Sequence, residues 1–209
     1  MEIQHPFRVI TNSVDGDVLQ VLAPIRVRLT IADLARLIPD RSRAGIQLAA
    51  DRLVSQGILK LDVIGRTRTY RLNEAHLLAA TVRSIANARS DLIHELKKIA
   101  ADLDASYAAL FGSAASDRMT PGSDIDILVL RSVDTTPERE QLLAAARERI
   151  SALTGNDARV LDVDAYDIGD PAYAALAKEI LEHGVTLHGD RAVLRDALSA
   201  RKRHTGSAQ

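Results

Sequence analysis

Two aspartates stand at the start of an apolar stretch in the second half of the chain. Asp124 and Asp126 are separated by one residue, and the apolar letters ILVL follow them. In a β-strand, residues two apart project from the same face, so the two carboxylates are expected to lie side by side. Like charges this close repel each other unless water or a cation compensates them. Because Mg²⁺ prefers oxygen ligands, the pair is either a solvated strand end or a site for Mg²⁺ or Mn²⁺.

A Gly-Ser pair precedes the aspartates and directly follows the predicted strand SYAALF. Gly112 has no Cβ, so a phosphate group can approach the backbone N–H groups here, and the Ser113 hydroxyl can donate a further hydrogen bond. Nucleotidyl transfer needs such a turn next to metal-binding carboxylates, because metal ions bridge the triphosphate and stabilise the attacking and leaving oxygens. The two motifs together predict a nucleoside triphosphate as substrate, bound by Gly112 and Ser113.

The stretch FGSAASDRMTPGSDIDILVL, residues 111–130, resembles the signature of the minimal nucleotidyltransferases, relatives of the DNA polymerase beta superfamily. The resemblance implies that Gly112 and Ser113 hold the phosphates of the nucleotide and that Asp124 and Asp126 bind Mg²⁺. Members of the family transfer a nucleoside monophosphate to a protein, a nucleic acid or a small molecule, and several serve as antitoxins. The resemblance therefore also implies a toxin or another protein as a candidate partner.

Active members of this family carry a third carboxylate on the third strand, as a metal ligand or a base. The usual position falls near Arg159, which cannot do either. In the segment ARVLDV the apolar residues alternate with acids, and this alternation leaves Asp162 and Asp164 on the polar face. Asp162 is predicted to be the third metal-binding and catalytic carboxylate, with Asp164 as the second choice. The alternative is that both are surface acids on a terminal strand.

The second half, residues 105–190, alternates strands and helices. Its predicted elements are strands at 106–111, 125–130, 158–163 and 185–189, a helix from Thr135 or Thr136 to about Leu153, and a helix from Pro171 to His183. Together they predict a mixed sheet with flanking helices, as in a nucleotidyltransferase-type domain.

The first half, residues 1–74, follows the plan of a winged helix-turn-helix domain. Three short helices are predicted at 14–23, 31–38 and 43–56, followed by two alternating strands joined around Gly65-Arg66. In such a domain the second helix of the motif enters the major groove of double-stranded DNA by its N-terminal residues. The predicted DNA-binding residues are Arg41, Arg43 and Gln47 on this helix and Arg66 and Arg68 on the hairpin. The alternative is a protein-docking or dimerisation module.

Residues 75–104 are predicted to form one long connecting helix, which joins the two domains or pairs with its copy in a homodimer. Residues 191–209 are basic and polar, and they are predicted to be a flexible tail. The expected fold class is therefore α+β.

Composition narrows the class of protein further. Residues 1–75 carry 11 Lys/Arg and 8 Asp/Glu, a net charge of +3, whereas residues 105–190 carry 7 and 15, a net charge of −8. The acidic half is not expected to hold nucleic acid without cations. Absence of cysteine excludes disulfides and thiolate metal sites and favours a cytoplasmic location. No N-terminal signal peptide is predicted, and no apolar run approaches the roughly 20 residues of a membrane span, so no membrane partner is expected.

These features predict a Mg²⁺-dependent nucleotidyltransferase that moves a nucleoside monophosphate to an unidentified acceptor, with a winged helix that binds DNA or regulates the enzyme. The alternative is a non-catalytic DNA-binding regulator or antitoxin whose nucleotidyltransferase fold binds a nucleotide or a partner protein. The loop Ala115-Ser116-Asp117 keeps this alternative open, because the family often has Ala-Arg-Gly there.

Overall fold

The computed structural model of the 209-residue chain describes residues 1–131 and 136–205. The chain divides into two compact units, one of Glu2–Ser90 and one of Asp91–Gln209 together with Met1. This division falls inside the segment for which one connecting helix was predicted. Among the described residues, no helix combines the length and the apolar character that crossing a bilayer would require.

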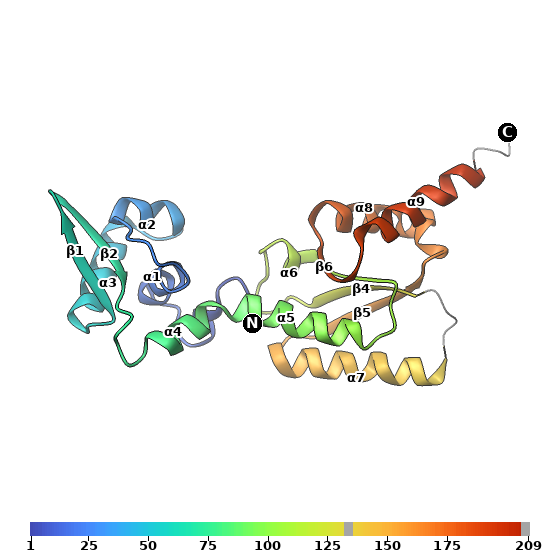
Figure 1. Cartoon of the computed structure of the whole chain (residues 1–209), viewed down its shortest axis with the longest axis horizontal. Helices are drawn as coiled ribbons and strands as arrows, with labels where there is room; N and C mark the ends of the chain where they lie inside the picture. Colours follow the sequence, from blue (N-terminus) through green and yellow to red (C-terminus); the bar gives the residue numbers. More distant parts are fainter. Residues whose placement is uncertain (132–135, 206–209) are drawn as a thin grey trace. The chain divides into compact units, whose positions relative to one another are not determined.

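The first unit consists of short helices and one antiparallel hairpin (Figure 1). Its elements are η1 (Pro6–Val9), α1 (Val14–Leu22), α2 (Ile31–Leu37), α3 (Arg43–Ser55), β1 (Leu59–Ile64), β2 (Thr67–Leu72) and α4 (Ala79–Ala86). In the hairpin, Leu59 lies opposite Leu72 at one end and Ile64 opposite Thr67 at the other. Leu29 adds an antiparallel bridge to the free side of β2, at Tyr70. The helices and the hairpin share one apolar core.

The predicted connecting helix is divided into two pieces, so this prediction was wrong in its extent. Helix α4 ends at Ala86, and α5 (Ala88–Ala101) begins after Asn87, whose backbone has left the helical region with ψ near 0°. Before α4, the side chain of Asn73 accepts a hydrogen bond from the N–H of Ala75 and holds a turn instead of a helix. Polar side chains that bond to nearby backbone groups compete with the helix in this way.

The second unit is built around a four-stranded sheet with the strand order β5-β4-β3-β6. Its elements after α5 are β3 (Tyr107–Phe111), α6 (Gly112–Ala115), β4 (Ile125–Arg131), α7 (Pro137–Thr154), β5 (Ala158–Asp164), η2 (Asp167–Gly169), α8 (Pro171–His183), β6 (Val185–Gly189) and α9 (Arg191–Thr205). Strands β4 and β5 are parallel, and β3 is antiparallel to both of its neighbours. The predicted α+β class, with a mixed sheet and flanking helices, is confirmed.

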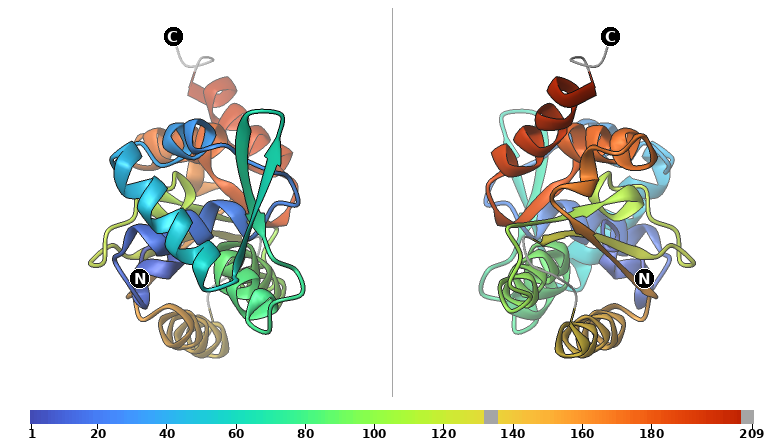
Figure 2. Two further views of the ribbon diagram at one scale, coloured as in Figure 1. Left: turned by 90° about the vertical axis from the view of Figure 1, so that its left-hand side faces the viewer. Right: turned by 90° about the vertical axis from the view of Figure 1, so that its right-hand side faces the viewer.

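Helices cover both faces of this sheet, with α5 and α7 on one side and α8 and α9 on the other (Figures 1 and 2). Alternate residues of the central strand β4 serve the two layers. Leu128 and Leu130 pack into the α8/α9 layer with Ile180 of α8 and Leu194 of α9. Ile127 and the other odd-numbered residues of β4 face α5 and α7, and the strand is buried almost along its whole length.

Helix α7 begins and ends as its sequence predicts. Thr136 is the N-cap, with its hydroxyl oxygen accepting a hydrogen bond from the N–H of Arg139 at 3.3 Å. Thr135, the other predicted cap, lies outside the described residues. Gly155 ends the helix with φ of 69°, a left-handed conformation that favours glycine.

The C-terminal segment is a helix and not the flexible tail that its composition predicted. Helix α9 runs from Arg191 to Thr205, and Leu194 is fully buried against the sheet layer. Val193, Ala197 and Leu198 also pack there, because they recur at helical spacing. The basic residues of this segment concealed its apolar stripe. Residues 206–209 of the predicted tail lie outside the described part of the chain.

Replacing Leu194 with Ala is therefore expected to destabilise the second unit by about 3 kcal/mol, since it leaves a cavity under α9. The measurement is the shift of the urea unfolding midpoint, with the exposed Asp196→Ala in the same helix as control. Equal midpoints for both variants would show that the segment does not pack as described.

Candidate functional site

The Gly-Ser turn and the second aspartate meet where β3 ends. Phe111, the last residue of β3, is paired with Asp126 on β4, so the chain turns into α6 directly beside this carboxylate. Gly112 has φ of +68°, and a Cβ added to it would lie 2.9 Å from Oδ2 of Asp126. Glycine is required here for its backbone conformation and for the close approach of the carboxylate. The fold therefore brings together the two motifs that the sequence places fourteen residues apart.

The loop between these motifs closes on itself. The hydroxyl of Ser116 donates to the carbonyl of Gly112 at 2.8 Å, and the N–H of Arg118 donates to the carbonyl of Ser113 at 3.0 Å. Nε of Arg118 also donates to the Ser116 hydroxyl at 3.1 Å. Asp117 is exposed, with φ of 56°. Ser116 thus contributes to holding the turn, although it differs from the residue that the family often has.

Negative charge is concentrated at Asp126. Burial raises the pKa of Asp126, and the carboxylate of Asp124 raises it further. Glu179 on α8 adds a smaller rise, whereas Arg159 lowers the pKa. Two partly buried carboxylates at one strand end form a donor set that fits a divalent cation. Among the described residues, no group of three His, Cys, Asp or Glu side chains is arranged to hold a metal, so water or substrate phosphate would have to complete the shell.

A cation of the protein itself lies beside this pair. In the parallel register of β4 and β5, Arg159 is the neighbour of Asp126. Nη2 of Arg159 lies 2.8 Å from Oδ2 of Asp124, while its side chain stays 73% exposed. The sequence pattern marked Arg159 only as the absence of a carboxylate and did not predict this ion pair.

Asp162 lies away from the aspartate pair, which contradicts the prediction that it completes the metal site. Its partner on β4 is Val129, an odd-numbered residue of that strand, so Asp162 belongs to the sheet face opposite Asp126. There Arg139 binds both carboxylate oxygens, with Nε 2.9 Å from Oδ2 and Nη2 2.6 Å from Oδ1. The hydrogen bonds to Asp162 raise the pKa of Arg139, and Nη1 of Arg139 donates to the carbonyl of Leu103 at 2.9 Å.

Asp164, the second choice, lies on the same face as Asp162. It accepts a hydrogen bond from Nη1 of Arg131 at 2.9 Å and another from the N–H of Tyr166 at 2.8 Å. The Asp162 side chain is only 11% exposed, so this residue is not a surface acid either. Asp162 connects β5 to α7 through Arg139, and Asp164 connects it to β4 through Arg131.

Three of the five predicted DNA-binding side chains make contacts within the first unit. Nε of Arg41 lies 2.7 Å from Oδ2 of the nearly buried Asp17. Nε2 of Gln47 donates to the hydroxyl of Tyr70 at 2.7 Å. Arg68 lies over the ring of Tyr70, at 6.0 Å from the centroid. These three side chains help to hold α1, α3 and β2 together.

Arg43 and Arg66 are exposed, as Arg68 is, but they differ from it in their contacts. Within residues 1–131 and 136–205, neither guanidinium takes part in a hydrogen bond or an ion pair. Arg43 is the first residue of α3, and Arg66 stands in the turn of the hairpin. Of the five predicted residues, these two remain available to a ligand.

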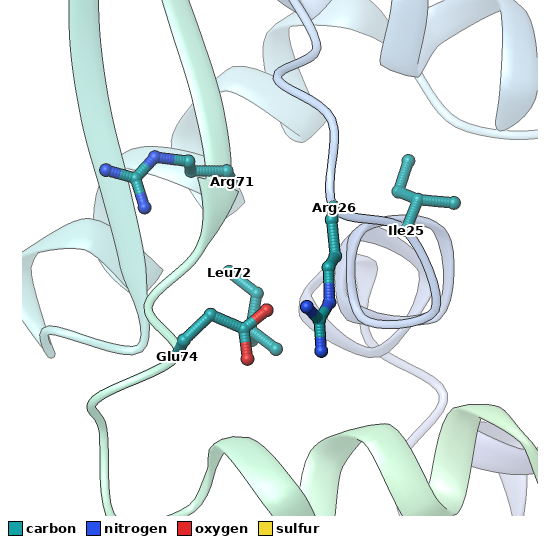
Figure 3. A pocket seen from close by; sticks show the side chains of 5 residues that line it. All are labelled: Ile25, Arg26, Arg71, Leu72 and Glu74. Atoms are coloured by element: carbon teal, nitrogen blue, oxygen red, sulfur yellow. The ribbon is translucent and has the colours of Figure 1, made fainter.

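A small pocket of about 250 Å³ opens beside the hairpin (Figure 3). It is lined by Ile25, Arg26, Arg71, Leu72 and Glu74. Hydrogen bonds from Arg83 lower the pKa of Glu74, and the charges of Arg83, Arg26 and Arg71 act in the same direction. The carboxylate in this pocket is therefore already paired, and the walls carry a positive excess.

Comparison with known families agrees with the geometry of the Gly-Ser turn and the aspartates. The family model described as polymerase beta, nucleotidyltransferase matches residues 72–191, more than half of the chain. The chain belongs to this nucleotidyltransferase family. The matched range contains the whole of the sheet and the site built on it. No curated protein matches the chain.

Three solved structures similar to part of this chain are toxin–antitoxin crystal structures. One, a toxin–antitoxin crystal structure with AMP-PNP, has 18% sequence identity and a TM-score of 0.40 over 55% of this chain and 90% of the other. A MntA-HepT structure has 16% identity and a TM-score of 0.37 over 56% of this chain and 91% of the other. A mutant from the same kind of complex has 16% identity and a TM-score of 0.39, over 55% and 89%.

Asp162→Ala is expected to destabilise the second unit by about 3 kcal/mol, because it leaves the buried guanidinium of Arg139 without its carboxylate. Urea unfolding measures this loss. The same variant should bind Mn²⁺ with unchanged affinity at a temperature where it is folded.

The matched control is Glu95→Ala, which breaks solvent-screened ion pairs with Arg149 and Lys98 and should leave the unfolding midpoint nearly unchanged. A stable Asp162→Ala protein with weakened Mn²⁺ binding would place Asp162 in the metal site after all.

Proposed function

We propose that this protein is a divalent-metal-dependent nucleotidyltransferase, which moves a nucleoside monophosphate from a nucleoside triphosphate to an acceptor. The observation that carries the proposal is the close approach of the Asp126 carboxylate to the backbone of Gly112, with Asp124 beside it. The backbone of Gly112 and the hydroxyl of Ser113 would bind phosphate oxygens, and Asp124 and Asp126 would hold Mg²⁺ or Mn²⁺. A bound metal supplies charge stabilisation for the phosphates.

In this reaction the nucleophilic oxygen of the acceptor forms a bond with the α-phosphorus. The bond from this phosphorus to the bridging oxygen of the β-phosphate breaks, and pyrophosphate leaves. The proton of the acceptor must go to a base. Arg159 cannot accept it, because a guanidinium stays protonated, and Asp162 lies on the other face of the sheet. Neither Arg159 nor Asp162 is therefore the base that takes the acceptor's proton.

A second candidate function follows from the same observation. Residue 159 is an arginine where active members of the family have a carboxylate. The site is therefore suited to binding a nucleotide or a partner protein without transfer, as in a regulator or an antitoxin. Where a nucleotide is bound, both candidates would use Gly112 and Ser113 for its phosphates and Asp124 and Asp126 for the metal, and they would differ only in turnover. For both candidate functions we propose a cytoplasmic location, since the chain contains no cysteine.

For the first unit we propose a winged helix-turn-helix domain over residues 1–74, followed by connecting helices and a nucleotidyltransferase domain over 105–190. The support is the order of three helices and a hairpin, together with the bridge from Leu29 to the free side of β2. Exposed Arg43 at the start of α3 and exposed Arg66 at the hairpin turn are placed as such domains present cations to double-stranded DNA. Docking of a protein, or of a second copy, on the same surface is the alternative.

The enzymatic proposal predicts that label moves from an α-³²P-labelled nucleoside triphosphate to an acceptor in the presence of Mg²⁺. Asp124→Ala/Asp126→Ala should reduce transfer by about 100-fold or more. Without the two carboxylates the metal is not held, and the developing negative charge on the phosphates loses its counter-ion. Each of the four nucleotides is tested with the protein itself, RNA and soluble protein extract as acceptors.

Asp102→Ala/Asp196→Ala is the control, since it removes two exposed carboxylates elsewhere in the same unit. Nucleotide binding without transfer would select the non-catalytic candidate. Absence of both nucleotide binding and transfer would exclude the enzyme and leave only the binding of a partner protein.

The DNA-binding proposal predicts salt-sensitive binding of the full chain to duplex DNA in fluorescence anisotropy. Arg43→Ala/Arg66→Ala should reduce the slope of log affinity against log salt by about 2, one for each phosphate contact. Arg149→Ala/Arg195→Ala removes the same charge from the second unit and should leave the slope unchanged. Salt-insensitive binding, or none, would favour protein docking.

A further inference from the structure

Three strands bring their polar groups to one level of the sheet. Phe111 on β3 is paired with Asp126 on β4, and Asp126 is the register neighbour of Arg159 on β5. The Gly112 turn therefore lies on one side of Asp126 and Arg159 lies on the other. Adjacent strands are about 4.8 Å apart, so the guanidinium is within easy reach of anything bound to the aspartate pair.

The contact of Arg159 with the pair is electrostatic and easily reversed. Its Nη2 lies 2.8 Å from Oδ2 of Asp124, and the side chain is 73% exposed. An exposed ion pair of this kind contributes little free energy, because water solvates both partners when they separate. The aspartate pair, in contrast, keeps its own repulsion whenever no cation is near.

We propose that Arg159 is the internal counter-ion of the aspartate pair and competes with the divalent cation for Asp124, so that it determines how tightly this site takes its metal. The inference rests on the proposed function, in which Asp124 and Asp126 hold the metal. A guanidinium is a permanent cation at physiological pH, so the charge of the competing side chain is constant. Arg159 leaves Asp124 when the metal binds, and a positive charge then stands beside the metal and weakens its binding.

The charges around the pair support this role. Asp126 is influenced by two further carboxylates, Asp124 on its own strand and Glu179 on α8, and by one cation, Arg159. Removal of Arg159 leaves these carboxylates without the cation that now balances them. A divalent ion binds such a group more tightly, most of all at low ionic strength.

The experiment is a Mn²⁺ titration of the full chain without nucleotide, followed by the electron paramagnetic resonance signal of free Mn²⁺. Arg159→Gln should lower the Mn²⁺ Kd by about five- to tenfold at low salt, and the difference should shrink as salt is added. Arg159→Lys keeps the charge and should stay near the wild-type value. Arg159→Glu adds a carboxylate and should bind most tightly.

Arg149→Gln, which removes another exposed arginine from an ion pair with Glu95, should leave the Kd unchanged. If the wild type binds Mn²⁺ and Asp126→Asn abolishes it, but Arg159→Gln has the wild-type Kd, the inference fails and the proposed function stands. If neither the wild type nor Arg159→Gln binds Mn²⁺, the proposed metal site itself fails.

Discussion

The close approach between the carboxylate of Asp126 and the backbone of Gly112 is the constraint on which the rest of the second unit depends. It requires a glycine in a left-handed conformation, and it requires β3 and β4 to pair in one register, with Phe111 opposite Asp126. That register is held by strands that are buried on both faces. A shift by one residue would turn every side chain of β4 to the other layer. The core of this unit therefore also positions the site.

The same residue type serves different purposes on the two faces of the sheet. Asp126 lies on the face of α8 and α9, where carboxylates gather and a cation is favoured. Asp162, on the face of α5 and α7, is neutralised by a bidentate Arg139 that also bonds to the carbonyl of Leu103. A buried pair of this kind is costly to break, so Asp162 contributes to the stability of the fold. The role of each aspartate depends on whether its position along the strand directs the side chain toward α8 and α9 or toward α5 and α7.

Arginines in the first unit divide in a similar way. The arginines that pair with Asp17, Asp51 and Glu74 link separate segments of the unit, and their charge is partly neutralised. Arg43 and Arg66 stay in solvent at the start of α3 and at the hairpin turn. The net charge of +3 in this half is therefore a poor guide, because it counts bound and free cations alike.

The sequence by itself determined the elements and the family. Alternating and helical patterns predicted the hairpin, the strands of the mixed sheet and the limits of α7, and the Gly-Ser and Asp-x-Asp motifs predicted the family to which the chain belongs. Periodicity describes one segment at a time, however, and β4 and β5 are separated by the whole of α7. Only their tertiary register decided that Asp162 faces away from Asp126 and that Arg159 stands beside it. Tertiary packing also made a helix of the basic C-terminal segment, because Leu194 packs into the core. At the start of the predicted connecting helix, a side-chain bond of Asn73 holds a turn in place of the helix. Within a strand, parity follows from the backbone alone, whereas the register between distant strands follows from how the layers pack.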